Sequence, residues 1–120
     1  MFTQPPRRGE IWFVDTPGQP YDPHQPRPAL VVSSNARNRN SDDVIVVPIF
    51  TNGLPGPTHI PLSAGIGGLP HDSVAYCEEM TTIHHDFVSH GPLGPPITEE
   101  PIAKIIRAIR RAIGEAVPEP

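Results

Sequence analysis

The sequence predicts a mainly β domain, a small barrel of five to seven short strands that is closed by one C-terminal helix. Short apolar runs rich in β-branched and aromatic residues recur along most of the chain, and such runs are typical of strands. Most of the 18 prolines and 10 glycines lie between these runs, where they favour turns. The last apolar segment has a helical period instead.

Length and composition predict one domain over residues 1–120, with loose termini at 1–6 and 116–120. The single cysteine, Cys77, excludes an internal disulfide framework and a cysteine-based zinc finger, and we expect a buried thiol. No apolar stretch approaches the ~20 residues that span a membrane, and no signal peptide is visible. We therefore expect a cytoplasmic protein without a membrane partner.

Seven segments are candidates for strands. They cover residues 9–14, 27–33, 43–49, 58–62, 72–79, 80–83 and 88–93. The segment 43–49 is strongly apolar, and we expect it to be central. The loop 15–26 is rich in Pro and Gly and is long for a small domain, which favours an ordered binding loop. Residues 34–41 and 51–57 predict turns, and the glycine-rich run 64–70 predicts a flexible connection.

The final segment predicts an amphipathic helix. Its apolar residues recur at i, i+3, i+4, i+7 and i+11, which places them on one face: Ile102, Ile105, Ile106, Ile109 and Ile113. Thr98 is expected to cap the start of the helix, where Glu99 and Glu100 suit the positive end of the helix dipole. Pro101 falls in the first turn, where a missing N–H group is harmless.

The charge pattern predicts a local anion site in an acidic chain. The net charge of −4 argues against a general nucleic-acid binder, which is expected to be basic. Arg27 opens the second predicted strand, directly after the proline-rich loop and before Pro28. A rigidly held arginine suits phosphate because its planar fork pairs with phosphate oxygens and keeps its proton. The alternative is an arginine that begins a strand by chance or pairs with a nearby carboxylate.

The histidines do not predict a metal site. The densest group, His84, His85, Asp86 and His90, lacks the His-x3-His spacing of a helical zinc site and falls in a predicted turn. The run 65–68 lacks the Lys-Ser/Thr that follows a phosphate-binding glycine loop. We expect neither a metal nor another cofactor.

Several motifs, in their order along the chain, resemble those of one toxin family. They are Arg8-Gly9-Glu10-Ile11-Trp12, Arg27-Pro28-Ala29-Leu30-Val31-Val32-Ser33-Ser34-Asn35, Val46-Val47-Pro48-Ile49, Asp72-Ser73-Val74, Thr82-Ile83 and Gly91-Pro92-Leu93-Gly94. With the closing helix, they resemble the MazF/PemK (Kid-like) toxins of type II toxin–antitoxin systems from about residue 8 to 114. The resemblance implies an SH3-like barrel, similar to Kid and CcdB, that forms a homodimer.

The resemblance also implies an activity and its partners. Members of the family cut single-stranded RNA at short sequences without a metal, so the chain is expected to be an endoribonuclease, or mRNA interferase. The implied products are a 2′,3′-cyclic phosphate and a 5′-hydroxyl, because the RNA's own 2′-hydroxyl is the nucleophile. A cognate antitoxin is expected to cover the RNA groove, and operator DNA is expected to be bound only indirectly, through the antitoxin.

The family's central catalytic pair, an Arg and a Thr or Ser, maps onto Arg27 and, less directly, onto Thr51. Arg27 would stabilise the extra negative charge of the pentacoordinate phosphorane. Relatives carry the hydroxyl two positions after the proline of the third strand, but here Phe50 stands there and Thr51 follows it. A shift of one residue turns a side chain to the other face of a strand, so either a bulge or turn returns Thr51 to the site or the hydroxyl is lost there. Phe50 is expected either to stack on a base or to pack in the core.

Further residues are expected to contact the RNA. Asp22 lies five residues before Arg27, where relatives have a proposed proton acceptor, and His24 lies close to it. Asp22 is otherwise only a turn former. Bases are expected to be read by the loops 18–26 and 51–57. The expected RNA-binding residues are Asp22, His24, Gln25, Arg37, Phe50, Asn52 and Glu79.

Two other interpretations are open. A catalytically weak relative would keep the barrel and act by binding its antitoxin, an operator or an enzyme. The acidic balance and Phe50 favour it, and so do Glu79 and Thr81, which stand where relatives have Gln and Arg and so weaken attraction for phosphates. The remaining interpretation is a structural or interaction module with an SH3-like barrel.

Overall fold

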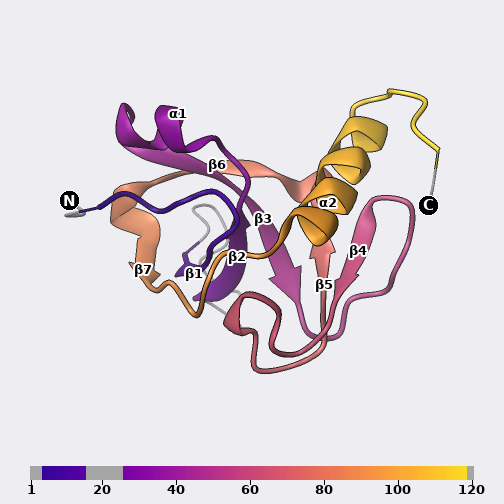
Figure 1. Ribbon diagram of the computed structural model, residues 1–120, viewed down its shortest axis with the longest axis horizontal. Coiled ribbons are helices and arrows are strands. Elements are labelled where there is room, and N and C mark those ends of the chain that lie inside the picture. The colour runs from indigo at the N-terminus through magenta and orange to yellow at the C-terminus, as the bar shows by residue number, and fades with distance from the viewer. Residues whose placement is uncertain (1–3, 16–25, 119–120) are drawn as a thin grey trace.

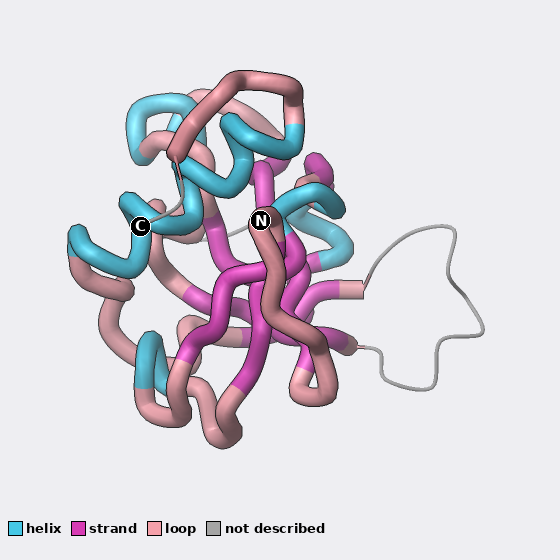
Figure 2. The backbone as a smooth tube through the Cα atoms, turned by 90° about the vertical axis from the view of Figure 1, so that its right-hand side faces the viewer, coloured by secondary structure: helices cyan, strands magenta, loops and turns pink. Residues whose placement is uncertain are grey.

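The computed structural model describes residues 4–15 and 26–118 and has the predicted fold class, an antiparallel sheet with one long C-terminal helix (Figure 1). The strands cross in the middle of the molecule, and the helices lie around them (Figure 2). The strands are β1 (Ile11–Val14), β2 (Arg27–Val31), β3 (Asp43–Phe50), β4 (His59–Leu62), β5 (Ser73–Tyr76), β6 (Thr81–His84) and β7 (Val88–His90). The helices are α1 (Asn35–Arg39) and α2 (Glu99–Ala112), and the 3₁₀ turns are η1 (Ile66–Gly68), η2 (Cys77–Glu79) and η3 (His85–Phe87). Neither α1 nor α2 is long and apolar enough to cross a membrane.

Strand β3 is the centre of the sheet. The strand order is β4-β5-β3-β2-β1-β7, and β6 also pairs with β3. Residues 43–46 of β3 pair with β6, whereas Ile49 and Phe50 pair with β5, and η2 carries the chain from β5 to β6. The predicted strand 72–79 is therefore shorter than expected. Pro48 lies where β3 changes its partner, so its missing N–H group costs the sheet no bond to β5 or β6.

Both faces of the central strands are buried. One apolar cluster contains Leu30 and Val47 and includes residues of α2, and a second cluster contains Ala29 and Val46. Burial on both faces explains why these strands are continuous apolar runs in the sequence. Arg27 points to the same side of β2 as Ala29, because side chains two residues apart share a face. It therefore stands at the end of the face that carries the second cluster.

Helix α2 has the predicted apolar face over most of its length. Its buried residues are Ile102, Ile105 and Ala108. The prediction for Ile113 is wrong, because the helix ends at Ala112 and Ile113 is 75% exposed. Thr98 occupies the N-cap position as predicted, but its side chain makes no capping hydrogen bond.

Two segments that the sequence predicts as loops contain helical turns or close packing. Residues 34–41 contain α1, whose first turn is capped because the Ser34 hydroxyl accepts a hydrogen bond from the Arg37 N–H. The glycine-rich run 64–70 contains η1, and two of its residues, Gly67 and Leu69, are buried. Gly68 has a φ of +87°, and a Cβ there would lie 2.3 Å from the Leu93 carbonyl oxygen. Both the backbone conformation and the lack of space require glycine at this position.

Candidate active site

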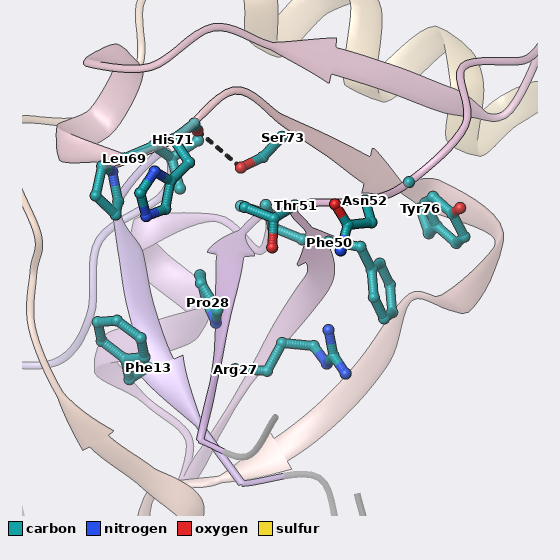
Figure 3. Close-up of a pocket in the computed structure, with 13 residues that line it drawn as sticks. Phe13, Arg27, Pro28, Phe50, Thr51, Asn52, Leu69, His71, Ser73 and Tyr76 are labelled. Atoms are coloured by element: carbon teal, nitrogen blue, oxygen red, sulfur yellow. Dashed lines mark hydrogen bonds between the residues drawn. The ribbon is translucent and has the colours of Figure 1, made fainter. Parts of the chain in front are cut away.

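A pocket of about 360 Å³ opens where β3 ends. Its walls come from the start of β2, from the end of β3 with the loop that follows, and from β5 with the segment before it (Figure 3). Four residues that the sequence singles out line this pocket: Arg27, Phe50, Thr51 and Asn52. The fold thus brings Arg27, at the start of β2, together with three consecutive residues at the end of β3 and in the loop that follows it.

The register of the sheet places Arg27 opposite Phe50. Ala29 pairs with Pro48, so the same antiparallel register, continued by two residues, sets position 27 against position 50. The Arg27 guanidinium accordingly lies over the Phe50 ring, with its Cζ atom 4.1 Å from the ring centroid. A cation–π contact of this kind contributes about 0.5–1 kcal/mol at an exposed site and more as water is excluded. Phe50 therefore supports the guanidinium at the wall of the pocket.

Phe50 faces the pocket and belongs to neither core cluster. Its ring lies between Arg27 and Tyr76, and the Tyr76 ring centroid is 4.6 Å away at an interplanar angle of 46° (Figure 3). Core packing, one of the two roles expected from the sequence, is therefore wrong. A base could stack on Phe50 only away from the face that Arg27 covers, so the ring acts first as a platform for the arginine.

Thr51 follows the last residue of β3 and begins a turn. The alternation of the strand ends there, so the one-residue shift relative to Phe50 does not send Thr51 to the other side of the sheet. Thr51 and Asn52 are both exposed and both line the pocket. A turn, and not a bulge, thus places the Thr51 hydroxyl in the same pocket as Arg27.

Three pocket residues carry polar groups that the sequence analysis does not assign to the site: His71, Ser73 and Tyr76. The buried Ser73 hydroxyl donates a hydrogen bond to the His71 carbonyl oxygen at 2.9 Å, which fixes the backbone before β5 (Figure 3). Ser73 and Tyr76 lie in a predicted strand, but only the pairing of that strand with β3 shows that it forms a wall of the pocket.

Other predicted site residues do not reach this pocket. Arg37 lies on α1 and forms an ion pair with Asp43, with 2.6 Å between Nη2 and Oδ1. Asp43 is the first residue of β3 and Phe50 is the last, which puts Arg37 roughly 20 Å from the pocket. Glu79 is exposed at the end of η2 and does not line the pocket. The predicted residues outside the described part of the chain are Asp22, His24 and Gln25.

The cysteine and the histidine-rich segment lie apart from this chemistry. Burial raises the pKa of the Cys77 thiol to about 12, so the thiol stays protonated at neutral pH, and the prediction of a buried thiol is confirmed. His84 Nδ1 lies 3.5 Å from an Asp86 carboxylate oxygen. Within residues 4–15 and 26–118, no three His, Cys, Asp or Glu side chains gather in a way that could hold a metal ion.

Comparisons with known proteins agree with this fold. Residues 7–113 match the family described as PemK-like, MazF-like toxins of type II toxin–antitoxin systems. An endoribonuclease from a mycobacterial species is 27% identical over 98% of this chain and 100% of its own, with a TM-score of 0.76. A mycobacterial endoribonuclease in complex with its cognate antitoxin is 29% identical over 96% of this chain and 99% of its own, with a TM-score of 0.74.

A more distant structure shares the fold. MazF from Deinococcus radiodurans is 20% identical over 92% of this chain and 97% of its own, with a TM-score of 0.75. The comparison with curated proteins gives no significant match. Because the family match spans all the strands that line the pocket and the closing helix, it accounts for the whole architecture. The chain belongs to the PemK-like, MazF-like toxins of type II toxin–antitoxin systems.

Proposed function

We propose that the protein is a sequence-specific endoribonuclease toxin that cuts single-stranded RNA without a metal. The observation that carries the proposal is that Arg27 and Thr51 line one open pocket, with the guanidinium supported by Phe50. Similarity to two mycobacterial endoribonucleases over nearly the full length supports the same class of activity. RNA cleavage inhibits translation and growth, which makes such an enzyme a toxin.

In this proposal the RNA supplies the nucleophile and the pocket supplies the stabilising charge. The 2′-oxygen attacks the adjacent phosphorus while its proton passes to a base, and the bond between phosphorus and the 5′-oxygen breaks. As it leaves, the 5′-oxygen takes up a proton from a general acid or from water, and the products are a 2′,3′-cyclic phosphate and a 5′-hydroxyl. Arg27 stabilises the phosphorane because its charge is permanent and its N–H donors lie in one plane. The Thr51 hydroxyl serves as a hydrogen-bonding partner of the reacting phosphate or of the 2′-hydroxyl.

The proton acceptor and the base-reading residues come from the loops around the pocket. Asp22 and His24 stay predicted acceptors, and Gln25 stays a predicted RNA contact. Among the described pocket residues, His71 contributes an imidazole, the side-chain type that most often transfers protons in enzymes. Asn52 contributes an amide that pairs with base edges.

We also propose the assembly that goes with this activity. Two copies form a homodimer with the RNA groove across their interface, and a cognate antitoxin occupies the groove when the toxin is silent. The similarity to an endoribonuclease in complex with its cognate antitoxin supports the antitoxin partner. Operator DNA is reached only through the antitoxin, and the RNA substrate places the action in the cytoplasm.

A cleavage assay tests the enzymatic proposal. The purified protein is incubated with a long unstructured RNA in EDTA, beside an Arg27→Ala variant. We expect the wild type to leave 2′,3′-cyclic phosphate ends and the variant to be at least about 10²-fold slower, the usual cost of losing one group that stabilises transition-state charge. The proposal is wrong if the wild type does not cleave, or if both proteins cleave equally.

One observation favours a second candidate function. Phe50 stands opposite Arg27, at the position where relatives carry the catalytic hydroxyl. A toxin altered in this way would act by binding a target or its antitoxin and would cut RNA weakly. This candidate predicts growth arrest on expression, relieved by the antitoxin, without RNA cleavage in the assay above.

A further inference from the structure

The loop between β3 and β4, residues 51–58, is held by two aromatic side chains that lie outside it. His59 is the first residue of β4, and Tyr76 lies directly opposite it on β5. Their rings stack with centroids 3.7 Å apart and planes 3° from parallel. Such a cross-strand ring pair stabilises the local sheet. It also orients the polar groups of the two side chains, the Tyr76 hydroxyl and the His59 ring nitrogens.

Both rings bind the backbone of Leu54, in the middle of the loop. The Tyr76 hydroxyl oxygen accepts a hydrogen bond from the Leu54 N–H at 3.1 Å. His59 Nδ1 lies 3.0 Å from the Leu54 carbonyl oxygen, and since a carbonyl can only accept, this nitrogen is the donor. His59 Nε2 contacts the Glu78 carboxylate, which also accepts from the Thr58 hydroxyl at 2.7 Å. The Leu54 backbone is therefore fixed at both polar groups although its side chain is 75% exposed.

Contacts on either side of Leu54 hold the rest of the loop. Gly53 lies against the Tyr76 ring so closely that a Cβ there would be 2.7 Å from Cε1. Near the far end of the loop, Arg111 of α2 donates from Nε to the Pro57 carbonyl oxygen at 2.9 Å. The hydrogen bond from Thr58, followed by the contact with His59, lowers the pKa of Glu78, so its carboxylate keeps its charge as a partner for His59.

The same stack continues into the pocket. The Tyr76 ring packs on Phe50, and Phe50 carries the Arg27 guanidinium. Thr51 and Asn52, which line the pocket beside this stack, belong to the loop that Tyr76 and His59 hold. The two rings are thus linked both to the arginine and to the loop that forms the adjoining part of the pocket wall.

We propose that Tyr76 and His59 are positioning residues that build the RNA-binding wall of the pocket before RNA arrives. By fixing the Leu54 backbone, they hold Thr51 and Asn52 in place and so set the affinity for RNA and the choice of cut sequence. A wall that is ordered in advance loses less conformational entropy on binding, and it rejects bases that do not fit its fixed shape. For its effect on cleavage this inference rests on the proposed endoribonuclease function, whereas the ordering of the loop does not.

Conservative variants separate the hydrogen bonds from the packing. Tyr76→Phe removes only the acceptor of the Leu54 N–H, and His59→Phe keeps a ring on Tyr76 but removes both hydrogen bonds. His84→Phe is the matched control, because His84 is an exposed histidine on β6, at the other end of β3. Hydrogen–deuterium exchange without RNA is expected to show the Leu54 amide about tenfold faster in Tyr76→Phe, with sheet amides unchanged. In a double variant that combines Tyr76→Phe with His59→Phe, wild-type exchange throughout residues 51–58 would overturn the proposal.

Cleavage kinetics then test what the ordered loop does. For the double variant we expect KM to rise about fivefold or more while kcat changes less, and we expect a mixed-sequence RNA to be cut at more sites. The His84→Phe control is expected to match the wild type in both measurements. A loosened loop with wild-type KM and wild-type cut sites would overturn the role in recognition. If the wild type cleaves no RNA, the proposed enzymatic function fails by itself, and RNA affinity in equilibrium titrations of the same variants decides this inference.

Discussion

The two ends of strand β3 each lie against an arginine, and the contacts at the two ends differ. At the Asp43 end, Arg37 donates to the Asp43 carboxylate at 2.6 Å and to the Asp43 carbonyl oxygen at 3.1 Å, so the protein itself takes up in-plane N–H groups of the guanidinium. At the Phe50 end, the flat face of the Arg27 guanidinium lies over an aromatic ring, with Cζ 4.1 Å from the ring centroid. The two arginines therefore differ in their contacts and in their place: Arg37 donates to oxygens of Asp43, whereas Arg27 stacks on a ring and lines the pocket.

The largest effect in this comparison is expected from Arg27→Lys. Lysine keeps the positive charge but has neither the planar fork that matches a phosphate nor the flat face that stacks on Phe50. We expect kcat/KM for a labelled RNA to fall at least about 10²-fold. The free energy of unfolding in urea is expected to change by less than about 1 kcal/mol, because the residue lies at the rim of the fold. If Arg37→Lys lowers cleavage as much as Arg27→Lys, the two ends of β3 do not differ in the way proposed.

A smaller effect is expected when the platform is changed instead of the arginine. Phe50→Leu keeps an apolar side chain but loses the ring face, so we expect kcat to fall about three- to tenfold, as the size of a cation–π contact implies. Phe50→Tyr keeps the ring and serves as the control, with a kcat near that of the wild type. The kcat values of both variants, measured on one RNA at steady state, show whether the ring face contributes to the rate. Equal rates for the leucine and tyrosine variants would show that the ring face has no part in placing Arg27.

Much of the fold could be predicted from the sequence because local patterns carry it. The run 43–49 is recognisable as a strand because it is apolar, without knowledge of its partner strands. Helix α2 is recognisable from its helical period, without knowledge of the sheet. Helix α1 could not be predicted, because its sequence is polar and its stability comes from tertiary contacts. Its buried Asn38 accepts from the Ser33 hydroxyl and donates to the Pro6 carbonyl oxygen, contacts that no local pattern shows.

The site was predictable only in part, because its geometry depends on which strands pair and in what register. Arg27 is recognisable by its place before an apolar strand, but its position over Phe50 follows from the pairing of Ala29 with Pro48. The stack of His59 on Tyr76 likewise needs the register of β4 on β5. Thr51 could not be placed from the sequence because one residue more of strand would have turned it to the other face.

The smallest effect is expected at the structural end of β3, and it depends on pH. A hydrogen bond from Ser41 and then one from Arg37 lower the pKa of Asp43 below its ordinary value of 3.8. Because the folded pKa lies below the unfolded one, the stabilisation by this carboxylate is complete above about pH 4 and is lost as the pH falls through the folded value. Both partners are about one-third exposed, so we expect Asp43→Asn to lower the free energy of unfolding by at most about 1 kcal/mol at neutral pH.

That difference is expected to shrink as the pH of the urea titrations is lowered from about 7 to below 3, since the wild-type carboxyl then becomes neutral like the amide that replaces it. Other carboxyl groups, Glu78 among them, titrate in both proteins and cancel in the comparison. A difference that stays constant with pH would mean that Arg37 and Ser41 hold this end of β3 by hydrogen bonds that an amide accepts as well as a carboxylate. The contrast with the Phe50 end would then lie in geometry alone and not in charge.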